Sequence, residues 1–269
     1  MPIINQRNLC YIFGSLFSIS ASVLANPLPW QGPYAGVYIG GGFGNNHVST
    51  NTGTVTNTSY FITSADINAV NNAGGWQKEP NAMIIGFQMG HDWIWKQMTY
   101  GIALDYGSLP LSSSSIVNNT YPDNFDQYSI DTSMNTNWLF TLRGKLGYQQ
   151  MLKYPSLLYL TGGMAMTKLK VSNNFVDNSS LVGTGGSESD QNQIGWTVGA
   201  GIEVAAFKHI SVNLEYLYID IPSIQTTSSI FNTQGGFGIP EQSLISPFFT
   251  TENLYANLLK IGLNYRFDE

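Results

Sequence analysis

Bulky apolar residues alternate with small or polar ones along much of this chain, and this alternation constrains its fold more than any other feature. A period of two is typical of a β-strand, in which successive side chains point to opposite faces. Eight segments of about ten residues show it, the length of a tilted transmembrane strand. They are approximately Tyr34–Gly44, Ala82–Trp95, Thr99–Leu109, Asn135–Tyr148, Leu157–Val171, Gly195–Ala205, Ile210–Ile219 and Leu254–Phe267.

The two faces of these segments differ in chemistry. One carries Leu, Ile, Tyr and Trp, whereas the other is rich in glycine, of which the chain has 28 among 269 residues. A water-facing sheet would alternate Lys and Glu instead, and only 10% of this chain is charged, against about 25% in ordinary soluble domains. A soluble lipocalin-like barrel or sandwich would place the bulky face inside, and an outer-membrane barrel places it in lipid. Because glycine fits a narrow lumen, the sequence favours the membrane barrel.

Connection lengths indicate how the strands are oriented. Three links between segments are short and contain one lysine each, Lys96, Lys153 and Lys208. The other four are long: Asn45–Asn81, Pro110–Met134, Ser172–Ile194 and Asp220–Asn253. This alternation is typical of an up-and-down barrel with periplasmic turns and extracellular loops. We therefore predict an all-β, eight-stranded antiparallel up-and-down transmembrane β-barrel with four long extracellular loops and both termini in the periplasm.

Residues 1–25 have the features of a secretory signal peptide. Arg7 is their only charge, and the stretch that ends at Leu24 is largely apolar. A membrane anchor helix is the alternative, but four serines interrupt a run that is shorter than the roughly 20 apolar residues of a span. The predicted barrel domain, residues 26–269, contains no cysteine, because the single cysteine is Cys10. Packing and hydrogen bonds alone must therefore hold it together.

Five motifs resemble the opacity-protein-like outer-membrane β-barrel surface antigens. They cover the strands but not the connections: Trp30–Gly40 (WQGPYAGVYIG), Leu158–Ala165 (LYLTGGMA), Gly195–Glu203 (GWTVGAGIE), Leu214–Tyr218 (LEYLY) and Ile261–Phe267 (IGLNYRF). The resemblance implies an eight-stranded barrel inserted by the outer-membrane assembly machinery, which reads a C-terminal aromatic residue. This chain departs from that pattern, because Asp268 and Glu269 follow Phe267.

Eight charged residues fall on the small face and are predicted to lie in the lumen. Counted from the short turns, they divide into two layers, each with two acids and two bases. The middle layer is Asp105, Arg143, Glu215 and Lys260, and the lower layer is Asp92, Lys145, Glu203 and Arg266. An unpaired charge in a dry lumen would cost several kcal/mol, so we expect these residues to pair and to fill the lumen. The alternative is a hydrated channel lined by the same charges.

Two lysines at the outer end of the fifth segment depart from the strand pattern. Lys168 falls on the predicted lipid face, and Lys170 follows it closely. One interpretation is a strand that has already ended in solvent. The other is contact with lipopolysaccharide phosphates.

The last long connection contains exposed apolar groups in the predicted barrel. Its aromatic residues are Phe231, Phe237, Phe248 and Phe249. An apolar patch on a loop tip is typical of an interaction site. The alternative is that these residues pack the loops onto one another.

The sequence contains no recognisable catalytic, cofactor-binding or metal-binding pattern. His91 and Asp92 point to opposite faces of one strand and cannot form a dyad. A surface protease site of His47 with Asp131 or Asp220 is the remaining enzymatic alternative. With a net charge of −6, the chain is a poor candidate for binding nucleic acid.

These observations together predict a non-enzymatic surface protein of the bacterial outer membrane. Its expected role is structural in the envelope, with adhesion or host contact through the loops. The expected partners are outer-membrane lipid, lipopolysaccharide, the assembly machinery and a host or surface ligand, and no cofactor is expected. A small-solute porin is the alternative, and an outer-membrane barrel enzyme is a more distant one.

Overall fold

Antiparallel strands make up most of the computed structural model, which describes residues 30–53, 58–150, 154–179, 182–235 and 238–268. The elements are β1 (Gly32–Thr52), α2 (Ser64–Gly74), β2 (Trp76–Lys78), β3 (Asn81–Trp95), β4 (Met98–Ser108), β5 (Ser112–Thr120), β6 (Gln127–Gln150), β7 (Ser156–Asp177), β8 (Gly183–Phe207), β9 (Ile210–Asn232) and β10 (Ile245–Arg266). The predicted signal peptide lies outside the described residues, as do Phe237 and Glu269.

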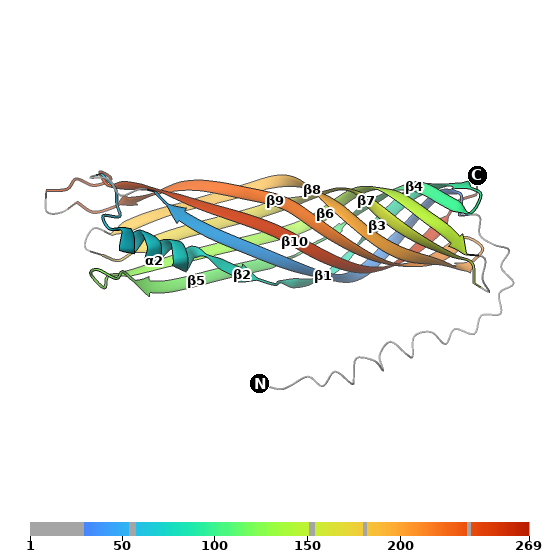
Figure 1. Cartoon of the computed structure of the whole chain (residues 1–269), viewed down its shortest axis with the longest axis horizontal. Coiled ribbons are helices and arrows are strands. Elements are labelled where there is room, and N and C mark those ends of the chain that lie inside the picture. Colours follow the sequence, from blue (N-terminus) through green and yellow to red (C-terminus); the bar gives the residue numbers. More distant parts are fainter. Residues whose placement is uncertain (1–29, 54–57, 151–153, 180–181, 236–237, 269) are drawn as a thin grey trace, which may run out of the picture.

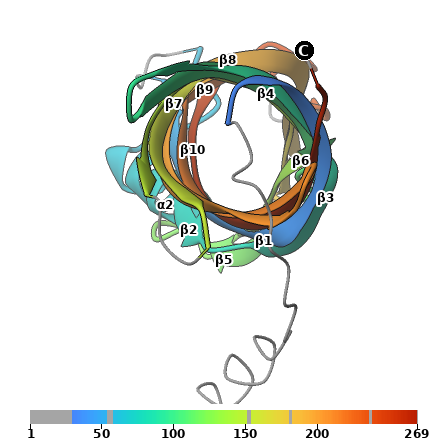
Figure 2. The ribbon, with the colours of Figure 1, turned by 90° about the vertical axis from the view of Figure 1, so that its right-hand side faces the viewer.

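Eight of these strands form a closed ring. Its order is β1, β3, β4, β6, β7, β8, β9 and β10, and β10 closes it by pairing with β1 from Tyr34↔Arg266 to Thr52↔Phe248. Figure 1 shows that the strands are tilted relative to the long axis of the barrel. Figure 2 shows the ring from the end where the C-terminus lies. We call this end, which has the short turns, the lower end. The predicted eight-stranded antiparallel barrel is confirmed.

The outer surface of the lower half is apolar and exposed. Its side chains include Ile39, Phe87, Ile102, Leu160, Leu214 and Ile261. Aromatic pairs lie at both edges of this band: Trp93 stacks on Tyr100 near a lower turn, with ring centres 5.7 Å apart, and Trp196 contacts Tyr218 higher up at 5.4 Å. An apolar band between two aromatic girdles is typical of a barrel surface in contact with lipid.

The ring strands continue far above this band. β6 to β10 have between 22 and 25 residues each, so much of the predicted loops is strand. In the upper half the two faces of the strands are reversed in character. Apolar side chains such as Phe175 and Phe248 point inward, and polar side chains point outward. That pattern is ordinary for a sheet with one face in water. The barrel is therefore membrane-like below and resembles a soluble barrel above.

Shorter elements complete the upper wall between β1 and β6. β5 follows β4 along the edge of β6 after an interruption at Leu109–Leu111, and β2 pairs with β1 at Asn46–Val48. The helix α2 packs on β1 and also contacts β5 and β6 (Figure 1). Its N-cap is Thr63, whose hydroxyl accepts the N–H of Asp66 at 3.1 Å. Within the described ranges, no helix has the length and apolar character needed to cross a membrane.

Candidate functional site

The lower layer of luminal charges is a closed ring of ion pairs. Lys145 Nζ lies 2.9 Å from Asp92 Oδ2 and 3.3 Å from Glu203 Oε2. Arg266 Nη2 lies 2.9 Å from Asp92 Oδ2 and 3.4 Å from Glu203 Oε1. Each acid thus contacts both bases, and Ser211 donates a further hydrogen bond to Glu203 at 2.5 Å.

The middle layer repeats this arrangement. Arg143 lies 2.5 Å from Asp105 Oδ2 and 2.7 Å from Glu215 Oε1, and Lys260 Nζ lies 2.6 Å and 2.7 Å from the same two carboxylates. All four side chains are at most 4% exposed. The ion pairs join the same two groups of four residues that the strand positions predict. Each layer is neutral, which offsets the cost of removing its charges from water.

Neutral polar and aromatic side chains fill the space around the two layers. Gln88 donates hydrogen bonds to Asn213 at 3.0 Å and to Asn264 at 2.5 Å. Lys145 Nζ lies 4.8 Å from the ring centre of Tyr159, within the range of a cation–π contact. The cavity left among these residues measures about 10 Å³, which holds one water molecule at most. The lumen is closed at this height.

Apolar clusters fill the lumen above the charges. The first contains Tyr38, Ile84, Leu109, Leu111, Met134, Leu139, Ala165, Leu169, Val171, Leu217, Ile219, Ile221, Ile224, Leu254, Ala256 and Leu258. The second, which we call the aromatic cap, contains Phe61, Val70, Tyr121, Tyr128, Ile130, Phe175, Ile230 and Phe248. Phe61 enters it from the segment before α2, with its ring centre 5.9 Å from that of Phe175. Sequence reasoning missed this cap.

Strand parity identifies only part of the cap. Phe175 has the same parity along β7 as the luminal Tyr159, and Phe248 has the same parity along β10 as Lys260, so an extended alternation places both inside. In β6 the register shifts between Thr136 and Leu139, and in β9 it shifts between Ile221 and Ile224. These irregularities move the inward positions by one residue, which the sequence pattern does not reveal.

A buried carboxylate joins three upper segments above the cap. The Tyr60 hydroxyl donates to Asp177 Oδ2 at 2.5 Å, and the Tyr121 hydroxyl donates to the same atom at 3.0 Å. The N–H of Ser179 donates to Asp177 Oδ1 at 2.6 Å. Burial, together with this carboxylate, raises the pKa of both phenols well above the usual value, so both stay protonated as donors. The connections before α2, after β5 and after β7 are thereby tied together.

Lys168 and Lys170 lie on the outer face of β7 above the apolar band, and each pairs with an acid of β8. Lys168 Nζ is 2.9 Å from Asp190, and Lys170 Nζ is 2.8 Å from Glu188. The strand continues past both lysines, so it has not ended there. Contact with lipopolysaccharide stays a prediction, because it requires phosphates to replace these carboxylates.

The phenylalanines of the last connection lie on different faces. Phe231 and Phe249 are half-buried on the outer face. Phe231 is registered with Ile245, which is 52% exposed, whereas Phe249 lies four residues further along β10 and is registered with Thr227. For Phe248 the interpretation as an exposed contact residue is wrong, and the alternative, packing of the upper segments onto one another, fits its position. Phe248 is 1% exposed, because it occupies an inward position of β10 and packs in the aromatic cap. Phe237 is outside the described residues.

The residues of the alternative enzymatic site lie apart. His47, Asp131 and Asp220 are on the outer faces of β1, β6 and β9, and no hydrogen bond or ion pair joins them in the part of the chain that the structure describes. Within that part, no group of three or more His, Cys, Asp or Glu side chains is placed to hold a metal ion.

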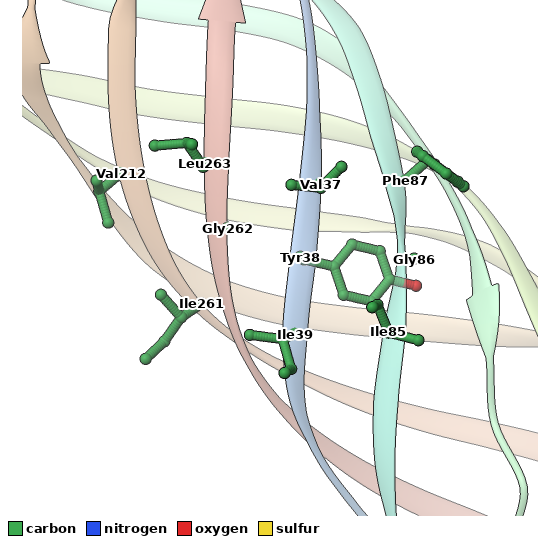
Figure 3. A pocket seen from close by; sticks show the side chains of 10 residues that line it. All are labelled: Val37, Tyr38, Ile39, Ile85, Gly86, Phe87, Val212, Ile261, Gly262 and Leu263. Atoms are coloured by element: carbon green, nitrogen blue, oxygen red, sulfur yellow. The ribbon is translucent and has the colours of Figure 1, made fainter.

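An apolar groove lies on the outer surface of the lower half. Figure 3 shows Val37 and Ile39 of β1 beside Ile85 and Phe87 of β3, with Gly262 of β10 on the other side. The groove belongs to the lipid-facing band and lies on the opposite side of the wall from the charge layers. Its chemistry suits an acyl chain of the surrounding bilayer.

Comparisons with known proteins agree with this architecture. A family model described as "Outer membrane protein beta-barrel domain" matches residues 12–267. The 31 kDa outer-membrane immunogenic protein of Brucella melitensis is 26% identical over 182 residues, which cover 68% of this chain and 65% of that protein. The 22 kDa outer membrane protein of Rhizobium leguminosarum is 33% identical over 135 residues, half of each chain. The chain thus spans less than two thirds of either relative.

Solved structures of similar proteins match at low identity. Neisserial surface protein A is 12% identical, with a TM-score of 0.31 and coverage of 86% of this chain and 97% of that chain. The outer membrane protease OmpT of Escherichia coli is 10% identical, with a TM-score of 0.36 and coverage of 91% of this chain and 99% of that chain.

Proposed function

The chain belongs to the outer-membrane β-barrel domain family and lies in the bacterial outer membrane, and we propose that it is a closed, non-enzymatic surface protein with a structural role in the envelope. The observation that supports this proposal is the filled lumen. Two neutral layers of ion pairs, an apolar cluster and the aromatic cap follow one another along the barrel. An eight-stranded barrel is just wide enough for side chains to fill it.

Conductance tests this function against the small-solute porin. The protein would be folded in detergent, shown to be folded by its heat-modifiable gel mobility, and inserted into planar bilayers beside a known porin. We expect no steady openings, because no continuous water column crosses the charge layers. Steady nanosiemens openings from folded protein would refute the closed barrel.

A second role, contact with a host or surface ligand, is supported by the outer face of the upper barrel. Phe231 and Ile245 are paired apolar residues on the outer face of β9 and β10, and Phe249 lies on the same face four residues further along β10, above the lipid-facing band. The Brucella relative's name describes it as immunogenic, and a protruding upper half would present epitopes in the same way. Replacing Phe231 and Phe249 by Ser should reduce binding of whole cells to host cells, with Thr227→Ser as the control. Unchanged binding at equal surface level would contradict this role.

Insertion by the assembly machinery through the C-terminal strand is also part of the proposal. Phe267 is 48% exposed on the outer side, and its N–H donates to Pro33 O at 3.0 Å. Asp268 extends to His209, 3.6 Å away, beyond the last paired residue. Removing residues 268–269 should leave assembly unchanged, whereas Phe267→Ala should lower the folded fraction in outer membranes. If removing residues 268–269 lowers the folded fraction and Phe267→Ala does not, the assembly machinery recognises the terminal acids instead of Phe267.

A further inference from the structure

Glu252 is a buried carboxylate without an ionic partner. It occupies an inward position of β10 in the upper half and is 1% exposed. Among the described residues neither of its oxygens has an ionic partner, and the Asn173 amide is a polar group that acts on the carboxylate. In the lower half, by contrast, Asp105 and Glu203 each contact two bases. Glu252 therefore differs from the paired acids of the lower half.

The oxygens around Glu252 are also unsatisfied. Thr250 Oγ1, on the same strand, and Thr50 Oγ1, on β1 in register with Thr250, have no partner among the described residues. Asn173 of β7 donates its Nδ2 to Thr226 of β9 at 3.2 Å, which leaves its Oδ1 unpaired. Unpartnered hydroxyl, amide and carboxylate oxygens thus lie at inward positions of β1, β7 and β10, in a polar layer between the lower apolar cluster and the aromatic cap. We call it the Glu252 layer.

No charged side chain in the described part of the chain neutralises Glu252. The inward residues that face it are Val48 and Thr50 of β1, Ile224 and Thr226 of β9, and Asn173 of β7. Burial raises the pKa of Glu252 to about 8, and the Asn173 amide lowers it in part. An ionised carboxylate left alone in such a site is strongly destabilising, so it must take up a proton or a cation.

The hydrogen-bonded wall of the barrel is interrupted between β8 and β9. β8 and β9 pair at Gly183–Thr184 and again from Trp196, but residues 185–195 and 221–230, all described, have no backbone pairing with each other. Gln191 occupies an inward position of β8 at this interruption, yet it is exposed. Ile224, the register partner of Glu252, lies on the other side. The wall thus exposes one inward position to solvent on the β8–β9 side of the barrel.

We propose that the Glu252 layer binds one monovalent metal cation from the external medium, with sodium as the reference ion. The Glu252 carboxylate would supply the charge, and Asn173, Thr50 and Thr250 would supply neutral oxygen ligands. Oxygen ligands suit hard cations. A single carboxylate balances one positive charge, whereas calcium sites require about six to eight ligands and usually several carboxylates. Such a cation would stabilise the upper barrel in salt and leave the lipid-facing half unaffected.

The test compares the folded full-length protein with Glu252→Gln in detergent micelles at pH 9. Urea unfolding is followed by heat-modifiable mobility at equal ionic strength of sodium, potassium or choline chloride. Glu188→Gln, an exposed acid on the outer face of β8, is the matched control. Sodium at about ten times its Kd should shift the unfolding equilibrium of the wild type and Glu188→Gln roughly tenfold relative to choline. It should not shift that of Glu252→Gln.

A second variant separates ligation from general salt effects. Thr250→Val keeps the carboxylate and removes one oxygen ligand, so it should require more sodium for the same stabilisation. Equal responses of wild type and Glu252→Gln to sodium would overturn the proposal. It would also fail if wild type were equally stable in sodium and choline, since protons alone would then compensate Glu252.

Discussion

Removing Lys260 tests whether the luminal charges hold the barrel as a coupled layer. Its Nζ lies 2.6 Å from Asp105 and 2.7 Å from Glu215, and its side chain is 1% exposed. In Lys260→Met, both carboxylates keep only Arg143, and the layer carries one uncompensated negative charge out of reach of water. Breaking a buried pair in this way costs about 3–5 kcal/mol. We therefore expect Lys260→Met to lose that much free energy of unfolding.

The assay is urea unfolding in micelles, followed by heat-modifiable mobility. The double variant Lys260→Met/Asp105→Asn restores neutrality and keeps the pair of Arg143 with Glu215, so it should recover most of the loss. Lys168→Met is the matched control: it breaks an exposed pair with Asp190, which contributes at most about 1 kcal/mol. The argument is refuted if Lys260→Met costs no more than the control, or if the double variant is less stable than the single one.

Three further predictions concern packing and protonation. A Cβ on Gly195 would lie 1.9 Å from the Asp220 carbonyl oxygen, so Gly195→Ala should lower the free energy of unfolding, measured in urea, by about 1–3 kcal/mol. Gly144→Ala is the control and should cost almost nothing, because the atom nearest to its added Cβ is 3.8 Å away. Phe61→Ala removes a ring from the aromatic cap and should lower the free energy of unfolding by about 3–5 kcal/mol. Protease should then cleave the upper barrel faster on intact cells, and an unchanged cleavage rate would contradict the packing of the cap. Because the folded pKa of Glu252 is raised to about 8, from an ordinary value of 4.5, its contribution to stability is complete below pH 4.5 and is lost as the pH rises through 8. In choline buffers the wild type should therefore lose stability relative to Glu252→Gln between pH 5 and 9, and parallel pH profiles would contradict this.

The sequence predicted the lower barrel well because lipid contact and luminal charge both leave a local pattern. In the segment around Ile102, alternate residues must face either lipid or lumen, so strand direction and face can be read residue by residue. The two charge layers were predicted for the same reason. Asp92 and Lys145 each lie a known number of residues from a short turn. Because a strand rises by a constant amount per residue, that number gives their height along the barrel.

The upper half was predicted poorly, since polar residues on a water-facing strand resemble those of a loop. Segments around Phe175 and Ile230 are rich in Ser, Thr and Asn, yet they belong to long strands. Irregularities at Thr136 and at Ile224 shift the inward positions, and α2 packs on β1 and contacts β5 and β6. Contacts of this kind depend on register between distant segments.

The sequence by itself determined the class of this protein, its ring of eight strands and the residues that could pair in the lumen. Periodicity of two residues is a local property, so the chain carries it whatever its neighbours are. Only the tertiary structure decided that Phe248 faces inward, that Tyr60 and Tyr121 share Asp177, and that Glu252 pairs with no base among the described residues. Those outcomes depend on which strands become neighbours and where a bulge shifts their register by one residue. A one-residue shift exchanges the inner and outer faces of everything beyond it.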